Sequence, residues 1–435
     1  MMTSHAELSD AMTANGVVAL YVKALSENDN SKNQIYLGTS FEALQILPSG
    51  KLKEHRTDRS TTLKASVRFL WMTESGTLSR APRTQLILYP KYPEVRLSGF
   101  LAGCEDGPSA YMQPTPAKRR KGSDGRYLVL GVSHKGDIIG YLAAPGTEIA
   151  IDLQSLISTV PESGSVILRI PFAGKKDPKA ELLAAVTNAR LNDWHRSSRL
   201  LADGRLIDYD ARNAGGYTLE ALFGIVPNGS PEPDYQDWEI KACSGAIVTL
   251  MTPEPDSGFY GDHGVEAFVC RYGHRSSANT LYFTGKHVFG TVCPTTGLKL
   301  DLIGMDVEGR RILSDDARLV LLDGDGTIAA AWSVFRLLNH WKRKHGRVLY
   351  VRYRKRIADG WPYFKFNPEI SLAEGTDFEL LIAAIRNGKI YLDPGSKVVT
   401  SLDGKTRVKA RSQFRIKLSE LAGLYRSLET VRVDK

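Results

Sequence analysis

Short runs of β-branched and aromatic residues dominate the chain from Val17 to about Pro171. The runs are VVALYVKAL, SVRFLWMTE, TQLILYP, YLVLGVS, IIGYLAA and SVILRIPF, and Gly, Pro, Asn and Asp cluster between them. Such runs favour strands, and the residues between them favour turns. Many short strands with little helix predict a small β barrel or sandwich for this part of the chain.

The pattern changes after a cluster of Gly, Pro and charged residues at Gly174–Pro178, which is typical of a linker. Helical periodicity follows in Ala180–Arg190, TLEALFGI and AAAWSVFRLLNHWKRKH. Strand-like runs, DWEIKA, AIVTLM and RVLYVRYRKRI, lie between and after them. The sequence therefore predicts two domains, residues 1–172 and 173–435, the second of mixed α/β type.

Composition narrows the classes of protein. A chain of 435 residues is long for one core, and its net charge of +9 indicates an anionic partner, of which nucleic acid is the commonest. A basic protein without such a partner would carry the same charge. The four cysteines form no CxxC pair, which predicts free thiols in a reducing compartment. No signal peptide or membrane-spanning run is visible, so we expect a cytoplasmic protein.

Candidate chemistry lies in GGYTLEALFGIVPNGSPEPDYQDWEIKA, residues 215–242. Side chains alternate between the faces of a strand, so Glu239 and Lys241 are expected on one face, with Asp234 in the loop before them. Mg²⁺ prefers carboxylate oxygens, and a lysine beside it can orient water or stabilise charge on phosphorus. Asp234 and Glu239 are thus the predicted metal ligands, and Glu220 on the preceding helix is a further candidate. The same spacing also occurs by chance in exposed strands.

The segment GGYTLEALFGIVPNG…PDYQDWEIK resembles the catalytic core of MvaI/BcnI-type restriction endonucleases, relatives of the mismatch-repair nickase MutH. The resemblance covers roughly residues 180–435 and includes RYG at 271–273 and FRIKLSEL at 414–421. It implies the PD-(D/E)xK nuclease fold, with Glu220, Asp234, Glu239 and Lys241 as the catalytic set, and a monomer that cuts DNA strands one at a time with Mg²⁺. This chain departs from the relatives in having KTRVKARSQFRI where they carry a histidine-containing loop.

Two basic segments are candidates for DNA contact. In HWKRKHGRVLYVRYRKRI a strand from Tyr350 would place Arg352, Arg354 and Arg356 on one face, a spacing that suits phosphates or guanine edges. A solvated edge strand would show the same pattern. KTRVKARSQFR supplies a second set. The predicted DNA-contacting residues of this half of the chain are Arg271, Arg352, Arg354, Arg407, Lys409 and Arg411.

The first part of the chain resembles EcoRII-like effector domains, which have a B3-like pseudobarrel fold. The resemblance rests on LYVKALSENDNSKNQIYLGTS at 20–40 and LPSG at 47–50. It implies a barrel whose two arms enter the major groove of DNA. Polar side chains in those arms can contact bases or phosphates, although SENDNSKNQ also fits a plain hairpin loop. The candidate residues are Asn28, Lys32, Asn33, Gln34, Lys91 and Arg96.

Together these observations predict a two-domain type II restriction endonuclease: an N-terminal B3-like β pseudobarrel as effector domain and a C-terminal α/β PD-(D/E)xK nuclease domain. Its partners would be Mg²⁺, one or two copies of a double-stranded DNA site and, genetically, a cytosine methyltransferase. The resemblances imply a CC/GG-type site such as CCWGG or CCSGG. A MutH-like repair nickase and a non-enzymatic DNA-binding regulator remain alternatives.

Overall fold

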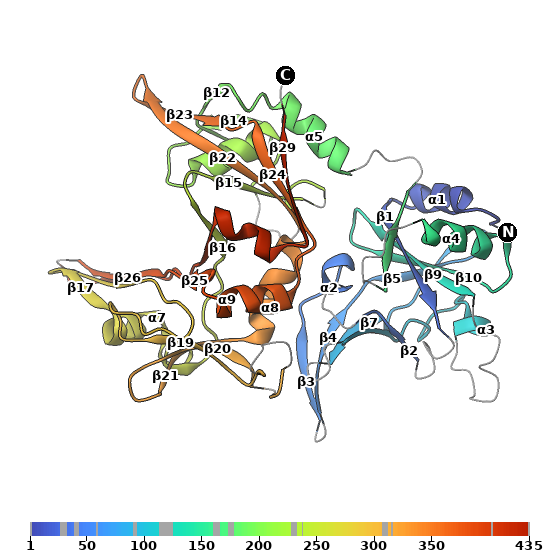
Figure 1. Cartoon of the computed structure of the whole chain (residues 1–435), viewed down its shortest axis with the longest axis horizontal. Helices are drawn as coiled ribbons and strands as arrows, with labels where there is room; N and C mark the ends of the chain where they lie inside the picture. Colours follow the sequence, from blue (N-terminus) through green and yellow to red (C-terminus); the bar gives the residue numbers. More distant parts are fainter. Residues whose placement is uncertain are drawn as a thin grey trace. The chain divides into compact units, whose positions relative to one another are not determined.

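The computed structural model describes residues 2–26, 33–38, 43–57, 60–89, 94–112, 125–159, 166–172, 178–227, 233–236, 238–306, 312–314, 316–401 and 403–433. The chain, drawn in Figure 1, divides into two units, Met1–Lys176 and Asp177–Lys435. Each unit has its own cluster of buried hydrophobic side chains. No helix in these ranges is both long and apolar enough to cross a membrane.

Unit 1 consists mainly of strands. Its elements are α1 (His5–Ala14), β1 (Val17–Leu25), β2 (Gln34–Tyr36), α2 (Ala43–Ile46), β3 (Lys53–Thr57), β4 (Ser60–Ser66), β5 (Phe69–Met72), β6 (Leu78–Arg80), β7 (Gln85–Tyr89), β8 (Glu94–Ser98), α3 (Ser109–Met112), β9 (Arg126–Ser133), β10 (Ile138–Ala143), α4 (Glu148–Ser158) and β11 (Leu168–Ile170). They form two open sheets, ordered β11-β1-β9-β10-β5-β6 and β2-β8-β7-β4-β3. The strand-rich character is confirmed, whereas the predicted pseudobarrel is not, because the described strands make two separate sheets.

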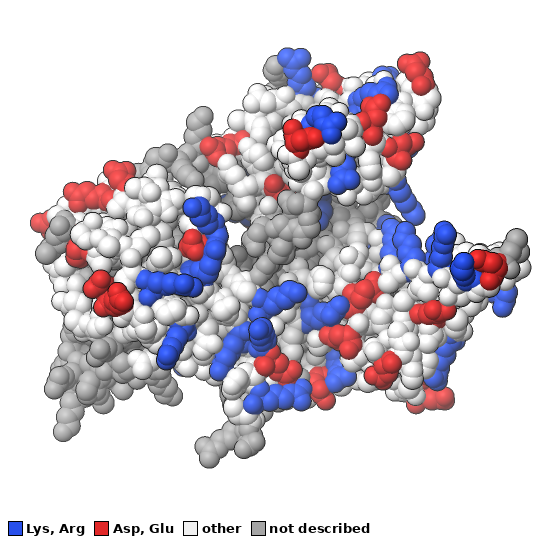
Figure 2. All heavy atoms as spheres, turned by 180° about the vertical axis from the view of Figure 1, so that it is seen from behind, with Lys and Arg blue, Asp and Glu red and all other residues white. Residues whose placement is uncertain are grey.

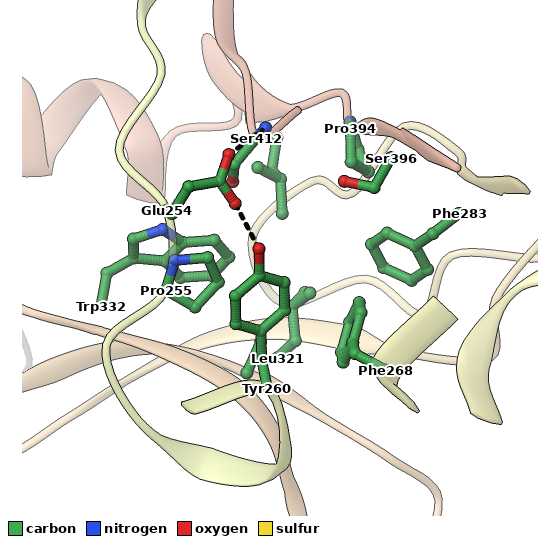
Figure 3. A pocket seen from close by; sticks show the side chains of 12 residues that line it. Glu254, Pro255, Tyr260, Phe268, Phe283, Leu321, Trp332, Pro394, Ser396 and Ser412 are labelled. Atoms are coloured by element: carbon green, nitrogen blue, oxygen red, sulfur yellow. Dashed lines mark hydrogen bonds between the residues drawn. The ribbon is translucent and has the colours of Figure 1, made fainter. Parts of the chain in front are cut away.

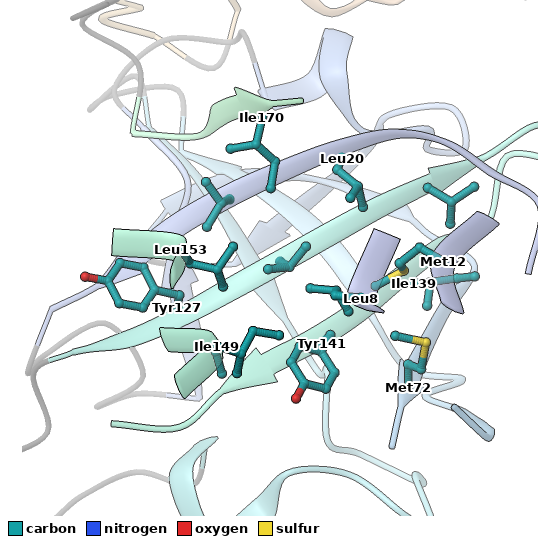
Figure 4. Close-up of a cluster of buried hydrophobic side chains, with 14 of the residues drawn as sticks. Leu8, Met12, Leu20, Met72, Tyr127, Ile139, Tyr141, Ile149, Leu153 and Ile170 are labelled. Carbon is teal, nitrogen blue, oxygen red and sulfur yellow. The ribbon is translucent and has the colours of Figure 1, made fainter. Parts of the chain in front are cut away.

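Helices α1 and α4 cover the six-stranded sheet and were not expected from the sequence. Figure 4 shows Leu8 of α1 and Leu153 of α4 among the buried side chains that pack on β1, β9 and β10. Each helix begins at a hydroxyl cap: Ser4 accepts from the Glu7 amide, and Thr147 accepts from the Ala150 amide. The prediction of little helix was wrong here because it was based on the strand runs and did not use these caps.

Unit 2 mixes helices and strands, as the sequence predicts. Its elements are α5 (Pro178–Asn188), β12 (Trp194–Arg196), β13 (Ser198–Leu200), β14 (Leu206–Asp208), α6 (Ala214–Leu222), β15 (Glu239–Cys243), β16 (Ile247–Met251), α7 (Gly258–Tyr272), β17 (His274–Ser277), β18 (Thr280–Thr284), β19 (Lys299–Ile303), β20 (Arg318–Leu322), β21 (Ile328–Ser333), α8 (Val334–Lys344), β22 (Arg347–Ala358), β23 (Trp361–Phe366), β24 (Glu369–Glu374), α9 (Phe378–Arg386), β25 (Ile390–Leu392), β26 (Gly395–Thr400), β27 (Thr406–Lys409), β28 (Phe414–Lys417), η2 (Leu418–Leu424) and β29 (Ser427–Arg432).

The long strand β22 organises the sheet that carries the candidate site. Its first half lies between β15, which runs parallel to it, and β24, which runs antiparallel. Its second half continues as a ribbon paired with β23, and β23 pairs in turn with β12. Figure 1 shows this ribbon reaching outward at the upper left of the view. One strand therefore connects the candidate site to the outer ribbon.

One helix prediction in unit 2 is wrong over part of its length. AAAWSVFRLLNHWKRKH was expected to be helical throughout, but Ile328–Ser333 forms β21, and the helix α8 begins at Val334. The run AAAW is buried and pairs with β20, and Ser333 caps α8 by accepting from the Arg336 amide. Tertiary pairing has overridden the helical preference of alanine.

Candidate active site

Strand β15 separates charged from apolar side chains. Trp238, just before the strand, and Ile240 belong to the buried cluster that also contains Leu349 of β22. Glu239 and Lys241 alternate with them, and Lys241 Nζ lies 2.6 Å from Glu239 Oε1. The prediction that these two side chains share a face is therefore confirmed.

Asp234 is held against β15 by a tight turn. Tyr235 and Trp238 exchange backbone hydrogen bonds of 2.9 and 2.8 Å, and Gln236 adopts a positive φ of 52°. The turn brings the Asp234 carboxylate back to the strand, where Oδ2 accepts from the Ile240 amide at 3.1 Å. The structure therefore binds Asp234 to the strand backbone at the residue between Glu239 and Lys241.

The ion pair in β15 lies at the boundary between core and solvent. Glu239 is 2% exposed, whereas the Lys241 side chain is 23% exposed. A buried carboxylate requires a compensating cation or hydrogen bonds, and Lys241 provides the cation. The ammonium group therefore neutralises Glu239 from the side on which a solvent-borne substrate can arrive.

Helix α6 carries Glu220 and packs against β15. Thr218 fixes its orientation, because its hydroxyl donates to the Ala214 carbonyl and accepts from the Ser198 amide at 3.1 Å. Gly215 is required where the helix meets β22, because a Cβ there would lie 2.5 Å from the Tyr353 ring. Glu220 itself is half-buried. The structure places it on a helix beside the strand, and its catalytic role stays a prediction.

Two carboxylates, Asp234 and Glu239, are the candidates for holding a metal ion. Over the part of the chain that the structure describes, no three His, Cys, Asp or Glu side chains gather closely enough to form a metal cage. A site of two carboxylates suits Mg²⁺, which retains several waters rather than filling its shell with protein ligands. The donor set therefore fits Mg²⁺.

Cys243 ends β15 but is not a chemical participant. Burial raises the pKa of its thiol to about 12, although the positive charges of Lys241 and Arg352 act in the opposite direction. The thiol therefore stays protonated at neutral pH, which disfavours it as a nucleophile.

A buried polar chain lies behind the ion pair. The Tyr350 and Tyr425 hydroxyls are 2.8 Å apart, and the Tyr425 hydroxyl is 3.3 Å from His345 Nδ1. His345 Nε2 faces the Leu250 carbonyl at 3.1 Å. A carbonyl only accepts, so in the neutral imidazole Nε2 donates and Nδ1 accepts, which directs the chain from Tyr350 through Tyr425 to His345.

This polar chain borders the candidate site, and the sequence did not predict it. Burial raises the pKa of both Tyr350 and Tyr425, and the negative charge of Glu239 acts in the same direction. Tyr350 is also the direct neighbour of Lys241 in the β15–β22 ladder. A buried tyrosine needs a hydrogen-bond partner for its hydroxyl, and this was the available signal in the sequence. The partners of Tyr350 come from distant segments, so the sequence could not identify them.

The predicted DNA-contacting residues of unit 2 are mostly accessible. Arg352 and Arg354 are exposed at alternate positions of β22, and Arg407 and Lys409 are exposed on β27. Figure 2 shows basic side chains gathered on the projecting arm of β17, β18, β26 and β27, at the right edge of the view. These positions allow the predicted contacts with DNA.

The other two unit 2 candidates are partly engaged within the protein. Arg411 is half-buried, and burial together with the neighbouring charges of Arg212 and Arg415 lowers its pKa. Arg271 is exposed and lies over the Phe259 ring, 4.7 Å from its centroid.

The unit 1 candidates are described only in part. Gln34 and Arg96 are brought together, with Arg96 Nη1 3.3 Å from Gln34 Oε1. Arg96 also pairs with Glu94 at 2.8 Å, so part of its charge is used within the protein. Asn33 is exposed with φ 54°. Asn28, Lys32 and Lys91 lie outside the described residues.

A separate pocket in unit 2 lies among α7, β18, β21, β25 and β26. Figure 3 shows the rings of Phe268 and Phe283 lining it and the carboxylate of Glu254 pointing to the Tyr260 hydroxyl. That hydroxyl donates to Glu254 Oε2 at 2.6 Å, and the Ser412 amide donates to Oε1 at 3.2 Å. The pocket holds none of the predicted catalytic residues.

Comparison with known proteins identifies a family for unit 2. Residues 189–425, more than half of the chain, match the sequence profile of the MvaI/BcnI restriction endonuclease family. No curated protein matches the chain.

Solved structures give weaker likenesses. Restriction endonuclease MvaI with its cognate DNA substrate is 21% identical, with a TM-score of 0.45, over 59% of this chain and 99% of that one. MvaI without DNA is 19% identical, with a TM-score of 0.34, over 59% and 99%. The UbaLAI restriction endonuclease B3 domain with cognate DNA is 15% identical, with a TM-score of 0.23, over 38% and 96%.

Proposed function

The chain belongs to the MvaI/BcnI restriction endonuclease family and is a site-specific deoxyribonuclease, and from this premise we propose that it is a Mg²⁺-dependent type II enzyme acting on double-stranded DNA. The observation that carries the proposal is the arrangement at β15. Asp234 is bound to the strand between Glu239 and Lys241, and the lysine ammonium is at the solvent boundary. Two carboxylates and one cation at one strand suit hydrolysis of a phosphodiester.

The acidic residues and the lysine would have different roles in the reaction. Asp234 and Glu239 would hold Mg²⁺, which when bound supplies Lewis-acid stabilisation of the phosphate and lowers the pKa of a bound water. Lys241 stabilises the negative charge that develops on the phosphate, and its Nζ can orient the attacking water. Glu220, on the helix beside β15, orients Lys241 or the ion from its own side.

The remaining features of the proposal concern control and specificity. Residues 1–172 would form a B3-like effector domain that binds one copy of the site, while residues 173–435 cleave another, as in type IIE enzymes. The site would be of the CC/GG type, such as CCWGG or CCSGG. The enzyme would act as a cytoplasmic monomer, protected by a cognate cytosine methyltransferase.

A cleavage assay on plasmid DNA tests this function. We expect purified full-length protein with Mg²⁺ to give linear products cut at one short sequence, and EDTA to abolish them. Nicking without linear product would favour a MutH-like repair nickase instead. If the wild-type protein binds DNA but never cuts it, a DNA-binding regulator replaces the nuclease.

A further inference from the structure

The outer ribbon of unit 2 presents cationic and aromatic side chains on one face. In the β22–β23 ladder Arg354 lies opposite Lys365, and Arg356 lies opposite Tyr363. In the β12–β23 ladder Lys365 lies opposite Trp194, and Tyr363 lies opposite Arg196. Directly paired residues project from the same face of a sheet. We name this set the arginine–aromatic face: Trp194, Arg196, Arg354, Arg356, Tyr363 and Lys365.

This face is turned to solvent, and on β23 the opposite face is buried, although Lys355 and Ile357 of β22 are exposed on that side. Arg196, Arg354 and Arg356 are exposed, whereas Phe364 and Phe366, which alternate with the β23 members of the set, are buried. A solvent face normally mixes both signs of charge, but here cations dominate. Within the described residues, neither Arg354 nor Arg356 forms an ion pair, and Lys365 forms none.

Two of the arginines are held in place by aromatic rings. The Arg356 guanidinium lies 4.2 Å from the centroid of Trp194 and 5.7 Å from that of Tyr363. The Arg196 guanidinium lies 5.1 Å from the centroid of Trp361 and pairs with Asp208 at 2.6 Å. Stacking limits the rotamers of Arg356 while its N–H groups remain available at the edge, so little further order is lost on binding an anion. Arg196 instead donates its Nε and Nη2 N–H groups to Asp208, so part of its charge is used within the protein.

The face is continuous with the candidate active site. In the parallel β15–β22 ladder Lys241 lies opposite Tyr350, and Cys243 lies opposite Arg352. Tyr350 is 3% exposed and covered, whereas Arg352, two residues on, is exposed. The sheet face therefore opens beside Lys241, and the next outward positions on β22 are Arg352, Arg354 and Arg356.

The spacing suits a polyanion of regular repeat. Alternate strand residues are about 6.7 Å apart, so the run from Tyr350 to Arg356 spans about 20 Å. DNA carries one phosphate per about 3.4 Å of axis on each strand, so a run of this length faces about six base-pair steps. A row of arginines at that spacing can follow one backbone strand without contacting bases.

We propose that the arginine–aromatic face binds the DNA backbone on one side of the cleaved phosphodiester, with Arg356 pre-ordered by Trp194 and Tyr363. This inference rests on the proposed nuclease function for the position of the cut, but not for the binding itself. Charge complementarity and continuity with Lys241 select DNA over an acidic protein partner.

Binding of a fluorescein-labelled duplex of mixed sequence, measured by anisotropy in EDTA over a range of salt concentrations, tests the face. Arg354→Ala with Arg356→Ala in the full-length protein should weaken binding about tenfold per arginine and reduce the salt slope by about two. Arg356→Lys, which keeps the charge, should keep the wild-type slope. Trp194→Ala should weaken binding a few-fold without changing the slope, because it removes the stacking and no charge.

The control is Lys299→Ala on β19, which removes a cation whose Nζ pairs with Asp301 at 2.7 Å. It should bind the duplex like the wild type. Unchanged affinity and slope in the double arginine variant would overturn the proposal, as would a wild-type protein that does not bind the duplex. Plasmid cleavage by the wild type is scored separately, so altered binding without any cleavage would support the face and remove the nuclease function.

Discussion

Two glutamates of unit 2 show how surroundings decide what a carboxylate does. Glu239 is 2% exposed and its charge is matched by Lys241, beside a sheet face that opens onto exposed arginines. Glu254 borders an aromatic pocket, and its two oxygens accept from the Tyr260 hydroxyl and the Ser412 amide. The first has a cation that a substrate can share, and the second accepts from two neutral donors fixed within the protein.

The difference separates a buried carboxylate that can take part in chemistry from one that stabilises the fold. An ion pair at the edge of a basic face can be rearranged when an anion arrives, because both partners remain charged and one reaches solvent. A carboxylate that joins a helix hydroxyl to a distant strand amide instead stabilises the fold around it. The pocket beside Glu254 is therefore not where we place the catalysis.

Lys241→Ala should have the largest effect on cleavage and so test the difference between the two glutamates most strongly. Loss of the ammonium removes charge stabilisation at the phosphate and the Lys241 charge beside Glu239, so we expect plasmid cleavage to slow by about 10³-fold or more. Duplex binding in EDTA should remain within a few-fold of wild type. The measurement is the single-turnover rate of linear product formation.

Glu254→Gln is the matched variant at the other carboxylate. It removes one charge from a buried hydrogen-bonding glutamate and should leave the cleavage rate within about threefold of wild type. Equal losses in both variants would show that neither carboxylate environment is special, and the assignment of Lys241 would fail.

Asp234→Asn sharpens the role of the loop carboxylate. The amide oxygen can still accept from the Ile240 amide, so the turn should persist, but the charge for Mg²⁺ is lost. We expect about 10²-fold slower cleavage, partly recovered at higher Mg²⁺ concentration. A rate that is unchanged at every Mg²⁺ concentration would exclude Asp234 as a ligand.

The sequence predicted the local part of the site and not its surroundings. The alternation Trp-Glu-Ile-Lys follows from strand geometry, so the shared face of Glu239 and Lys241 could be derived from four letters. The chain's own residues gave no register between strands far apart. The pairing of Arg356 with Tyr363, and of Tyr363 with Arg196, depends on three segments and could not be predicted.

Fold errors have the same origin. AAAWS has helical propensity, and only its pairing with β20 makes it a strand. The buried chain of Tyr350, Tyr425 and His345 joins a strand, the residue after η2 and the residue after α8. Local signals predict elements, whereas packing between distant segments decides which side chains share an environment.

Glu254→Ala should cost stability and not activity. Truncation leaves the Tyr260 hydroxyl and the Ser412 amide without their acceptor, which should lower the free energy of unfolding by about 2 kcal/mol. Urea denaturation measures this, and the plasmid assay under folding conditions should give the wild-type rate. A large loss of cleavage in fully folded protein would mean that the pocket contributes to catalysis.

Acid should lower the free energy of unfolding through protonation of His287, which lies near this pocket. This residue is 0% exposed, stacks on Phe283 of the pocket, and burial lowers its pKa to about 4. The unfolded chain binds this proton near pH 6.5, so the stabilisation is complete above that pH and is lost as pH falls toward 4. Between pH 7 and pH 5 the loss should be about 2 kcal/mol.

The check is urea unfolding at both pH values for the wild type and His287→Gln. The variant has no titrating group at this position, so its stability should fall less between pH 7 and pH 5 than that of the wild type. Parallel losses in the two proteins would assign the acid sensitivity to other groups.

Tyr425→Phe should have the smallest effect and test whether the polar chain behind Glu239 positions the ion pair. The variant leaves His345 Nδ1 and the Tyr350 hydroxyl without their shared partner, so we expect about 1 kcal/mol lower stability. If the chain also positions Glu239, the cleavage rate should fall by less than tenfold and the apparent affinity for Mg²⁺ should fall with it. Lower stability with an unchanged Mg²⁺ titration would place the chain, like Glu254, on the structural side of the comparison. Tyr350, the next member of the polar chain, is also the strand partner of Lys241. A matching shift in the Mg²⁺ titration of Tyr350→Phe would therefore show that the polar chain acts on the site through β22.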